Sequence, residues 1–299
     1  STCQTVNLKT VITAHKMVQL AKLENLIGEL TKNGIQVIYL EDLKSTLDNI
    51  LAPYSPIKDF DIKVINNNST DGTTEMLDEY ASLYNNVTHI KNNINIGGNA
   101  NIVKAFVENL DKDYIWLLAD NDKYNFEGWG EILYAINNDY DVIMTRKCNN
   151  NISELFYKAN LISSCIYKTK NITSAVVENM YDNIRYLFPH LAVMAKNIND
   201  NNKIYIPSKD IVILGVNPGY KTTLIRGRNK NEIPESRKKI FWSVGFFNSI
   251  ELIKDRKKQI EIIENLRHYH RSLFDLFKSI IIYNRTIADN YFYNLIQIF

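Results

Sequence analysis

Tyr-Ile-Trp-Leu-Leu-Ala-Asp-Asn-Asp, residues 114–122, joins the most apolar run of the chain to a polar cluster. A short, fully apolar run of this kind is typical of a strand that is buried on both faces of a parallel sheet. In such sheets, ligands bind at the carboxyl ends of the strands. The stretch therefore predicts a buried strand of an α/β protein, with a polar site directly after it.

The segments around this stretch alternate between strand-like and helix-like patterns. Short apolar runs predict strands at 61–65, 87–90 and 142–144, and apolar residues at helical spacing predict helices at 39–51, 73–84, 101–110 and 131–136. Since helices that alternate with strands usually connect neighbouring parallel strands, the pattern predicts a mainly parallel sheet flanked by helices.

The chain divides into three parts by pattern and charge. Residues 1–24 are a weakly helical N-terminal extension, residues 25–220 hold the predicted sheet, and residues 221–299 are basic, with helices expected at 236–250, 253–266 and 273–282. The first 200 residues carry 18 basic and 24 acidic residues, and the remainder carries 17 basic and 9 acidic. This asymmetry predicts a separate partner for the basic region, such as an anionic acceptor, a membrane surface or a second copy of the chain, and two solvated surfaces of opposite charge are the alternative. No nucleic-acid-binding motif accompanies the basic residues, so nucleic acid is not an expected partner.

Cysteine usage and hydropathy bear on the compartment. Cys3, Cys148 and Cys165 are odd in number and widely spaced, which fits neither a disulfide framework nor a cysteine metal site. The sequence has no continuous run of about 18 apolar residues and no signal-peptide pattern. We therefore expect a cytoplasmic protein that can lie peripherally at the inner face of the membrane.

Two further polar clusters follow predicted strands. Residues 66–73 read Asn-Asn-Asn-Ser-Thr-Asp-Gly-Thr, and residues 95–101 read Asn-Ile-Gly-Gly-Asn-Ala-Asn. Helix capping explains one Ser, Thr or Asp of the first cluster but does not require a run of polar residues. The paired glycines of the second cluster allow a ligand to approach the backbone, and the N–H groups at a helix start attract phosphate. Each cluster alone is also compatible with an ordinary strand-to-helix turn.

Residues 120–122 have the chemistry of a cation site. Two carboxylates, Asp120 and Asp122, flank Asn121 directly after the buried strand. Such oxygen ligands suit a hard divalent cation, Mn²⁺ or Mg²⁺, that also holds the oxygens of a diphosphate. The alternative is a polar loop that simply leaves a buried strand.

In this order, the three clusters resemble motifs of the family 2 glycosyltransferases, which have the Rossmann-like GT-A fold. Residues 66–73 match a pattern of the form D-N-x-S-x-D-x-T, residues 95–99 match N-x-G-x-x, and residues 120–122 match D-x-D. The resemblance extends over about residues 37–145 and is greatest to bacterial sugar transferases of the abequosyltransferase type. In those enzymes the triplet T-Y-N precedes a helix, and Thr-Lys-Asn at residues 31–33 could be that element.

The resemblance implies a nucleotide-sugar donor, with a UDP-sugar as the first choice. The donor-binding residues that it implies are Thr31, Asn33, Asn66, Asn68, Asp71, Asn95, Gly97, Gly98, Asn99, Asp120 and Asn121, and the implied metal ligands are Asp122, as the more direct one, and Asp120. Asn66 and Asn121 stand where relatives have Asp, which lowers the negative charge near the cation.

The resemblance to inverting members also implies a base that takes the proton of the acceptor hydroxyl. Those members use a carboxylate, often in a Glu-Asp pair, and no such pair occurs between residues 150 and 200. His190 lies in the comparable region and is our first candidate, because the unperturbed pKa of histidine is about 6.5. Asp182 is the second candidate. The other possibility for His190 is a helix-start residue that packs between Phe188 and Leu191.

The basic segment 221–230 contains Arg226 and Arg228. In GT-A enzymes a loop after the sheet often closes over the donor. We therefore expect these two guanidinium groups to neutralise the diphosphate as it leaves, and a solvated basic loop is the alternative.

Together these observations favour a metal-dependent, inverting hexosyltransferase that moves a sugar from a nucleotide donor to a glycan or lipid-linked acceptor. The alternative is a non-catalytic protein of the same fold that binds a nucleotide sugar or a partner, which the two Asp-to-Asn changes and the missing Glu-Asp pair favour. A P-loop NTPase is excluded, because the GxxxxGK[ST] motif does not occur. A sugar-phosphate nucleotidyltransferase would need a Gly-rich loop containing Arg near the N-terminus, and none is present.

Overall fold

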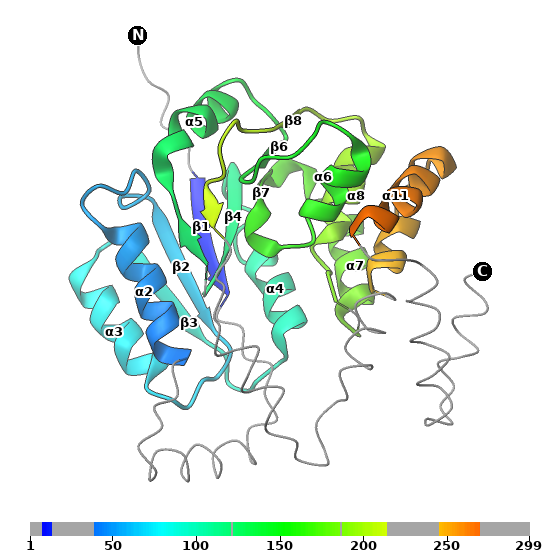
Figure 1. The fold of residues 1–299 in the computed structure, drawn as a ribbon. Coiled ribbons are helices and arrows are strands. Elements are labelled where there is room, and N and C mark those ends of the chain that lie inside the picture. Colours follow the sequence, from blue (N-terminus) through cyan, green and yellow to red (C-terminus); the bar gives the residue numbers. More distant parts are fainter. Residues whose placement is uncertain (1–7, 14–38, 121, 186, 214–244, 270–299) are drawn as a thin grey trace.

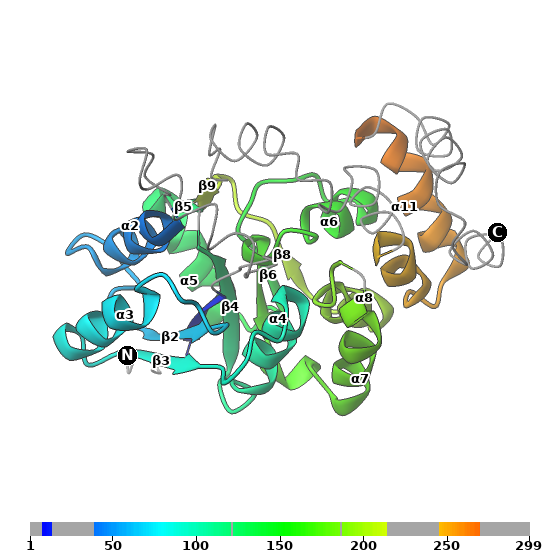
Figure 2. The same ribbon diagram turned by 90° about the horizontal axis from the view of Figure 1, so that it is seen from below.

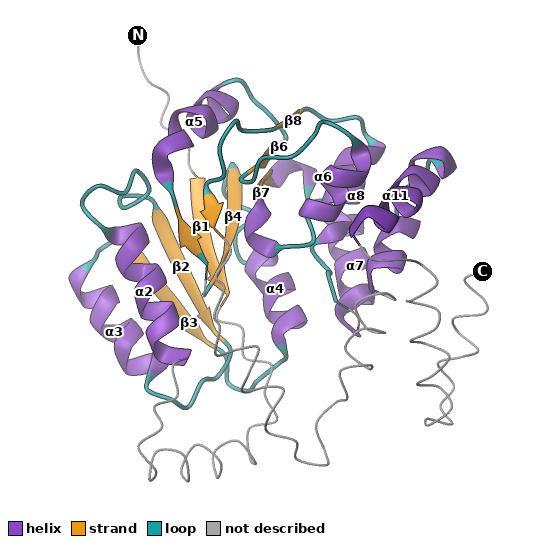
Figure 3. Cartoon of the chain, in the orientation of Figure 1, coloured by secondary structure: helices purple, strands orange, loops and turns teal. Residues whose placement is uncertain are grey.

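The computed structural model describes residues 8–13, 39–120, 122–185, 187–213 and 245–269 (Figure 1). Within these ranges a seven-stranded sheet has the strand order β3-β2-β1-β4-β7-β6-β8, with helices on both faces (Figure 3). Its strands are β1 (Leu8–Thr13), β2 (Asp61–Asn66), β3 (Val87–Lys91), β4 (Tyr114–Ala119), β6 (Val142–Met144), β7 (Cys165–Lys168) and β8 (Ile204–Tyr205). A two-stranded sheet pairs β5 (Lys123–Tyr124) with β9 (Val212–Ile213).

The large sheet is mixed, whereas the sequence predicts a mainly parallel one. Strands β1 to β4 pair with one another in parallel, and β6 pairs in parallel with β8. Strand β7 lies between β4 and β6 and is antiparallel to both. The reason lies in the connection 145–164, which contains α6 (Ile152–Lys158). Because Met144 pairs with Cys165, this connection begins and ends at the same edge of the sheet, so the strand after it must run back.

Helices cover both faces because the central strands are apolar on both sides. In β4, Ile115 and Leu117 belong to one hydrophobic core and Tyr114, Trp116 and Leu118 to the other, as the two-residue period of a strand requires. The first core lies under α4 (Gly98–Val107), α6, α7 (Ser174–Asp182) and α8 (Leu191–Asn199), and the second lies under α2 (Tyr39–Leu51), α3 (Thr73–Leu83) and α5 (Trp129–Asn137). Short 3₁₀ turns are η1 (Phe126–Gly128), η2 (Ile162–Ser164), η3 (Thr169–Asn171) and η4 (Asn183–Arg185).

Most helices and strands predicted between residues 39 and 144 are present. The bounds of α2 and β6 agree with the prediction, and the other elements differ by a few residues. The largest shift is at α4, which begins at Gly98 and not at residue 101. Its first turn consists of small and polar residues, so the apolar pattern cannot detect it.

The segment 8–13 is a strand, whereas the sequence analysis predicts a weakly helical extension. Strand β1 pairs in parallel with β2 on one side and with β4 on the other, so it lies inside the sheet (Figure 1). The predicted domain start at residue 25 excludes this strand. Its Thr, Val and Ile residues favour extended structure, but only the two long-range pairings make that preference decisive.

The C-terminal residues that the structure describes are helical, as predicted. Residues 245–251 form one helical segment, and α11 (Arg256–Tyr269) forms the next. Figure 2 shows α11 beside α6, on the opposite side of the molecule from α2 and α3. Phe246 anchors the first segment, because its buried ring packs against Phe156 and Phe188. The predicted helix at 273–282 lies outside the described residues. Among the helices described, none has the length and apolar character needed to cross a bilayer.

Candidate functional site

The polar clusters meet at one edge of the sheet. Thr13, the last residue of β1, pairs with Ile65 of β2 and with Ala119 of β4, so these three parallel strands end side by side. Strand β3 ends next to β2, where Asn66 pairs with Lys91. The loops that follow β2, β3 and β4 are therefore neighbours, as expected for the ligand-binding edge of an α/β sheet.

The turn after β2 uses its first asparagine internally. The Asn66 side chain is fully buried, its Oδ1 accepts a hydrogen bond from the backbone N of Ser69 at 2.8 Å, and its Nδ2 donates to Thr74 Oγ1 at 3.2 Å. Asn68 has a positive φ of 60°, which asparagine tolerates better than most residues. Asp71 Oδ1 accepts a hydrogen bond from Thr73 Oγ1 at 2.5 Å at the start of α3. Both ends of the Asn66 amide are thus bonded within the turn, so this predicted donor-binding residue stabilises the turn itself.

The second asparagine of the turn joins it to the loop after β3. Asn67 Oδ1 accepts hydrogen bonds from Asn92 Nδ2 and from the backbone N of Ile96, both at 3.0 Å. Asn67 Nδ2 donates to Asn95 Oδ1 at 2.9 Å, and this oxygen also accepts from the backbone N of Gly97 at 2.9 Å. Asn67 therefore connects two of the three clusters, although the sequence analysis does not single it out.

The start of α4 is held by the same set of amides. Asn92 Nδ2 also donates to Asn101 Oδ1 at 2.9 Å, and Asn101 Nδ2 donates to the carbonyl oxygen of Ile65 at 3.1 Å. Gly97 has a φ of 82°, which lets the chain turn from the loop into the helix at Gly98. The backbone N–H groups at this helix start are therefore presented at the same edge of the sheet, where they suit an anion.

Asn99 links this loop to a segment much later in the chain. Its Nδ2 donates to the carbonyl oxygen of Ile184 in η4 at 3.0 Å. The predicted donor-binding loop is thus in contact with the region that contains Asp182, which is exposed at the end of α7.

The aspartate cluster follows β4, and its second carboxylate is buried. Asp122 is only 6% exposed, and its Oδ2 accepts a hydrogen bond from Ser163 Oγ. The backbone of the cluster is held from the other side by α2, because Thr46 Oγ1 lies 2.8 Å from the carbonyl oxygen of Asp120 and 3.1 Å from that of Asp122. Asp120 is partly exposed. The structure thus places both predicted metal ligands at the ligand-binding edge.

Tyr124, in β5, follows the aspartate cluster two residues after Asp122. Its backbone N donates to Asn49 Oδ1 at 3.0 Å, and its buried ring meets Trp116 edge-on at 5.5 Å between centroids. Burial raises the pKa of its hydroxyl well above the usual range, and the nearby charges of Asp122 and Asp120 raise it further. Tyr124 therefore remains neutral and acts as a packing residue beside the carboxylates.

The donor set suits a cation that is shared with a substrate. In the described part of the chain, no group of three or more His, Cys, Asp or Glu side chains could hold a metal ion by itself. Mg²⁺ and similar ions are commonly bound by one or two carboxylates together with substrate phosphates, not by an all-protein cage. Asp120 and Asp122 fit this type of site and do not fit a permanent structural metal.

His190 precedes α8 and is 3% exposed. Its Nε2 lies 3.1 Å from the carbonyl oxygen of Ala159 and 3.0 Å from that of Asn160. Since carbonyl oxygens only accept hydrogen bonds, the ring carries a hydrogen on Nε2. The ring also packs against Phe188, with centroids 6.2 Å apart, and its Nδ1 is buried, so this arrangement fits the packing role, and a base role would require Nδ1 to become accessible to the acceptor.

The remaining predicted residues, Thr31, Asn33, Asn121, Arg226 and Arg228, lie outside the described residues. Thr46 and Ser163, by contrast, contact the aspartate cluster in the structure and are absent from the predicted site. Nothing in the local sequence marks either residue, because each reaches the cluster through a contact that is distant along the chain.

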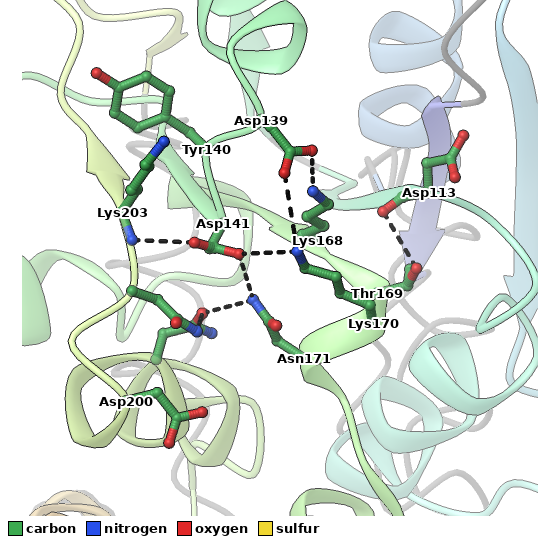
Figure 4. A network of polar contacts seen from close by, with 12 residues as sticks. Asp113, Asp139, Tyr140, Asp141, Lys168, Thr169, Lys170, Asn171, Asp200 and Lys203 are labelled. Carbon is green, nitrogen blue, oxygen red and sulfur yellow. Dashed lines mark hydrogen bonds and ion pairs between the residues drawn. The ribbon is translucent and has the colours of Figure 1, made fainter.

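A second concentration of charge lies at the opposite edge of the sheet, where β4 and β6 begin and β7 ends (Figure 4). Asp139 pairs with Lys168, whose hydrogen bond lowers the pKa of the Asp139 carboxyl. Asp141 accepts hydrogen bonds from Asn171 Nδ2 and from the backbone N of Lys203, both at 3.0 Å. These carboxylates bind their own neighbours across strand ends, so the network stabilises the fold at the edge away from the candidate site.

Several solved structures are similar to the chain. TarS of S. aureus (residues 1–349), solved with UDP, aligns with a TM-score of 0.56 and 13% identity over 89% of this chain and 73% of that one. The same protein solved with UDP-GlcNAc gives a TM-score of 0.56 and 12% identity over 89% and 74%. The mannosyltransferase PcManGT of Pyrobaculum calidifontis, solved with GDP-Man and Mn²⁺, gives 0.55 and 10% over 97% and 79%. At these identities the similarity shows a shared fold, an α/β fold of the GT-A type.

Sequence comparison identifies the family. No curated protein sequence matches the chain. The comparisons support the family-level resemblance predicted from the motifs and give no support for a closer relation to abequosyltransferases. The sequence profile described as "Glycosyl transferase family 2" matches residues 37–202, which is more than half of the chain. The protein therefore belongs to glycosyl transferase family 2.

Proposed function

We propose that the protein is a metal-dependent, inverting hexosyltransferase that moves a sugar from a nucleoside-diphosphate sugar to a hydroxyl of a glycan or lipid-linked acceptor. The observation that carries this proposal is the meeting of three polar loops at one sheet edge, where the Asp122 carboxylate, in the loop after β4, is buried and held by Ser163. Family membership supports the reaction class.

A UDP-sugar is the proposed donor. TarS has been solved with UDP and with UDP-GlcNAc, and PcManGT with GDP-Man. In this chain, the turn that contains Asn66, Asn68 and Asp71 would lie toward the nucleobase, with Asp71 as its candidate contact because the Asn66 amide is bonded within the turn, and the loop 95–99 would line the donor pocket. The N-terminal end of α4, which begins at Gly98, is suited to its phosphates. Arg226 and Arg228 remain the proposed cations for the diphosphate leaving group.

Asp122 and Asp120 are the residues that would hold a divalent cation, Mn²⁺ or Mg²⁺. PcManGT was solved in complex with GDP-Man and Mn²⁺, and the two-carboxylate arrangement of this chain fits a cation shared with diphosphate oxygens. When bound, the cation would stabilise the negative charge that develops on the diphosphate. Thr46 and Ser163 hold the loop and the carboxylate in place for this purpose.

The transfer itself would be a direct displacement at the anomeric carbon. The acceptor oxygen forms the new bond to that carbon as the bond to the diphosphate oxygen breaks, which inverts the configuration. We propose that the acceptor proton passes to Nδ1 of His190, whose Nε2–H is oriented by the carbonyls of Ala159 and Asn160. Asp182 is the second candidate for this proton.

The basic C-terminal helices are proposed to meet either the inner face of the membrane or a second copy of the chain. Lys254, Arg256 and Lys257 are exposed at the start of α11, which gives this end of the helix a positive surface. An anionic membrane surface attracts such clusters.

The test compares Asp122→Ala with Asp141→Ala, a carboxylate that is engaged at the opposite edge of the sheet. We expect Asp122→Ala to abolish turnover, measured as sugar transfer or donor hydrolysis with a panel of nucleotide sugars. We expect it also to abolish the Mn²⁺-dependent binding of UDP. Asp141→Ala should keep both, with lower thermal stability. Unchanged turnover in Asp122→Ala would refute the site. Mn²⁺-dependent UDP binding by the unmodified protein, without turnover on any donor, would favour the non-catalytic alternative.

A further inference from the structure

Ser163 lies next to Asp122 although 41 residues separate them in the sequence. Its hydroxyl donates a hydrogen bond to Asp122 Oδ2, and the two side chains are 1% and 6% exposed. Ser163 belongs to η2, which directly precedes β7. Because β7 runs antiparallel to β4, the start of β7 and the end of β4 lie at the same edge, and this brings the serine to the aspartate.

The backbone of Ser163 is itself held in place. Its carbonyl oxygen accepts hydrogen bonds from Trp116 Nε1 at 2.8 Å and from Thr145 Oγ1 at 2.6 Å. The backbone N of Thr145 donates to the carbonyl oxygen of Ser164 at 2.9 Å, which joins the end of β6 to η2. Trp116 and Thr145 are fully buried. Ser163 therefore cannot shift without breaking hydrogen bonds in the interior of the protein.

We propose that Ser163 is a positioning residue for the cation-binding carboxylate of Asp122, an inference that rests on the proposed function. A carboxylate has about four acceptor positions, and the serine hydroxyl occupies one of them. A cation would use other acceptor positions, and the hydrogen bond from Ser163 restricts the rotation of the carboxylate group. A neutral hydroxyl does this without cancelling the negative charge that the cation requires. Partners that orient metal ligands in this way typically change metal affinity or activity by about 10- to 100-fold when they are removed.

The adjacent Ser164 provides a matched control. It is as deeply buried as Ser163, and within the described part of the chain its hydroxyl has no hydrogen-bond partner. Ser163→Ala and Ser164→Ala therefore remove the same atom from the same 3₁₀ turn, and only the first removes a contact with Asp122. An effect of general packing should appear in both variants, and an effect on the carboxylate should appear in one.

The experiment measures UDP binding by isothermal titration at a series of MnCl₂ concentrations, with EDTA as the metal-free reference. We expect Ser163→Ala to need about 10- to 100-fold more Mn²⁺ for half-maximal binding, and Ser164→Ala to stay within about threefold of the unmodified protein. An unchanged Mn²⁺ requirement in Ser163→Ala would overturn the positioning role. The same shift in both variants would also overturn it, because it would indicate a packing effect.

Failure of the proposed function gives a different result. If the unmodified protein shows no Mn²⁺-dependent UDP binding, the proposed function fails before Ser163 is examined. If Ser163→Ala does not fold, Thr145→Val replaces it, with Thr145→Ser as its control. The first variant removes the hydrogen bond to the Ser163 carbonyl and the second keeps it. A higher Mn²⁺ requirement in Thr145→Val alone supports the inference, and equal requirements overturn it.

Discussion

Asn67 and Asn66 are adjacent asparagines, and the structure predicts that replacement by aspartate destabilises the protein more at position 67 than at position 66. Asn67 is 1% exposed, and its Nδ2 donates to Asn95 Oδ1. The orientation of both amides is set by backbone donors, because Ile96 N donates to Asn67 Oδ1 and Gly97 N donates to Asn95 Oδ1. In Asn67→Asp, an ionised oxygen would replace the donor and face the oxygen of Asn95. Rotating the Asn95 amide would give the carboxylate a donor but would break the bond from Gly97 N, so one hydrogen bond is lost in either orientation.

The expected cost follows from these contacts. One hydrogen bond with a net value of about 0.5–1.5 kcal/mol is lost. The new charge is buried with two donors, Asn92 Nδ2 and Ile96 N, and the ammonium of Lys104, which donates to Asn92 Oδ1 at 2.9 Å, would offset part of the cost. Burying a polar group whose hydrogen bonds are incomplete costs about 1–3 kcal/mol in proteins. We therefore expect Asn67→Asp to lower the free energy of unfolding by about 2–4 kcal/mol at pH 7.

Asn66→Asp is the matched control. The carboxylate oxygen that replaces Oδ1 can still accept from the backbone N of Ser69. The other oxygen would meet the hydroxyl of Thr74, which can rotate and donate where it now accepts. This carboxylate would also be buried with two donors but would lose no hydrogen bond, so we expect Asn66→Asp to lower the free energy of unfolding by about 0.5–1.5 kcal/mol less than Asn67→Asp does.

Urea denaturation of both variants between pH 3 and pH 8 tests this reasoning. Burial should raise the pKa of the carboxyl introduced at position 67 above its unfolded value of about 3.9. Below that value the group is protonated in both states and its O–H can donate to Asn95, so the stability deficit should be small. The deficit should grow as the pH rises from the unfolded pKa to the higher folded one. Equal stability of the two variants at pH 7, or a deficit in Asn67→Asp that is independent of pH, would refute the argument.

Two further predictions concern the C-terminal helical segment and the proposed base. A Cβ at position 245 would lie 2.4 Å from the carbonyl oxygen of Leu187, so Gly245→Ala should lower the unfolding free energy by about 1–3 kcal/mol. A Cβ at position 130, in α5, would have no atom within 4 Å. Since alanine favours a helix more than glycine does, Gly130→Ala should raise the unfolding free energy by up to about 1 kcal/mol. Thermal unfolding checks both, and a neutral Gly245→Ala would contradict the close approach. His190→Ala should reduce turnover by about 100- to 10,000-fold with UDP binding retained. A loss below about fivefold would assign the proton to Asp182 or another carboxylate.

The strands and helices between residues 39 and 144 can be predicted from the sequence because each is marked by a pattern of neighbouring apolar residues. Apolar residues recur at helical spacing in α2, and Val142–Met144 is a continuous apolar run that becomes β6. Such periods are properties of neighbouring residues, so they can be read without knowing the fold. β1 was missed because its short segment becomes a strand only through pairing with β2 and β4.

In the candidate site, too, some residues can be predicted from local sequence and others need the tertiary structure. Asp120 and Asp122 could be proposed from the sequence because they directly follow an apolar strand, and a strand end is a local feature. Asn66 was proposed to face the donor, whereas the structure uses its amide inside the turn and gives the bridging role to Asn67. Adjacent asparagines look equivalent in a sequence, and only their different surroundings separate them.

The sequence by itself determined the alternation of strands and helices and the position of three polar clusters after strands, because hydrophobic period and turn composition are local. Only the tertiary structure decided that the sheet is mixed and that Ser163 meets Asp122. Both outcomes depend on β7 lying antiparallel beside β4. That pairing joins residues about fifty positions apart, and its stability comes from the buried core that they share and not from any pattern in either segment.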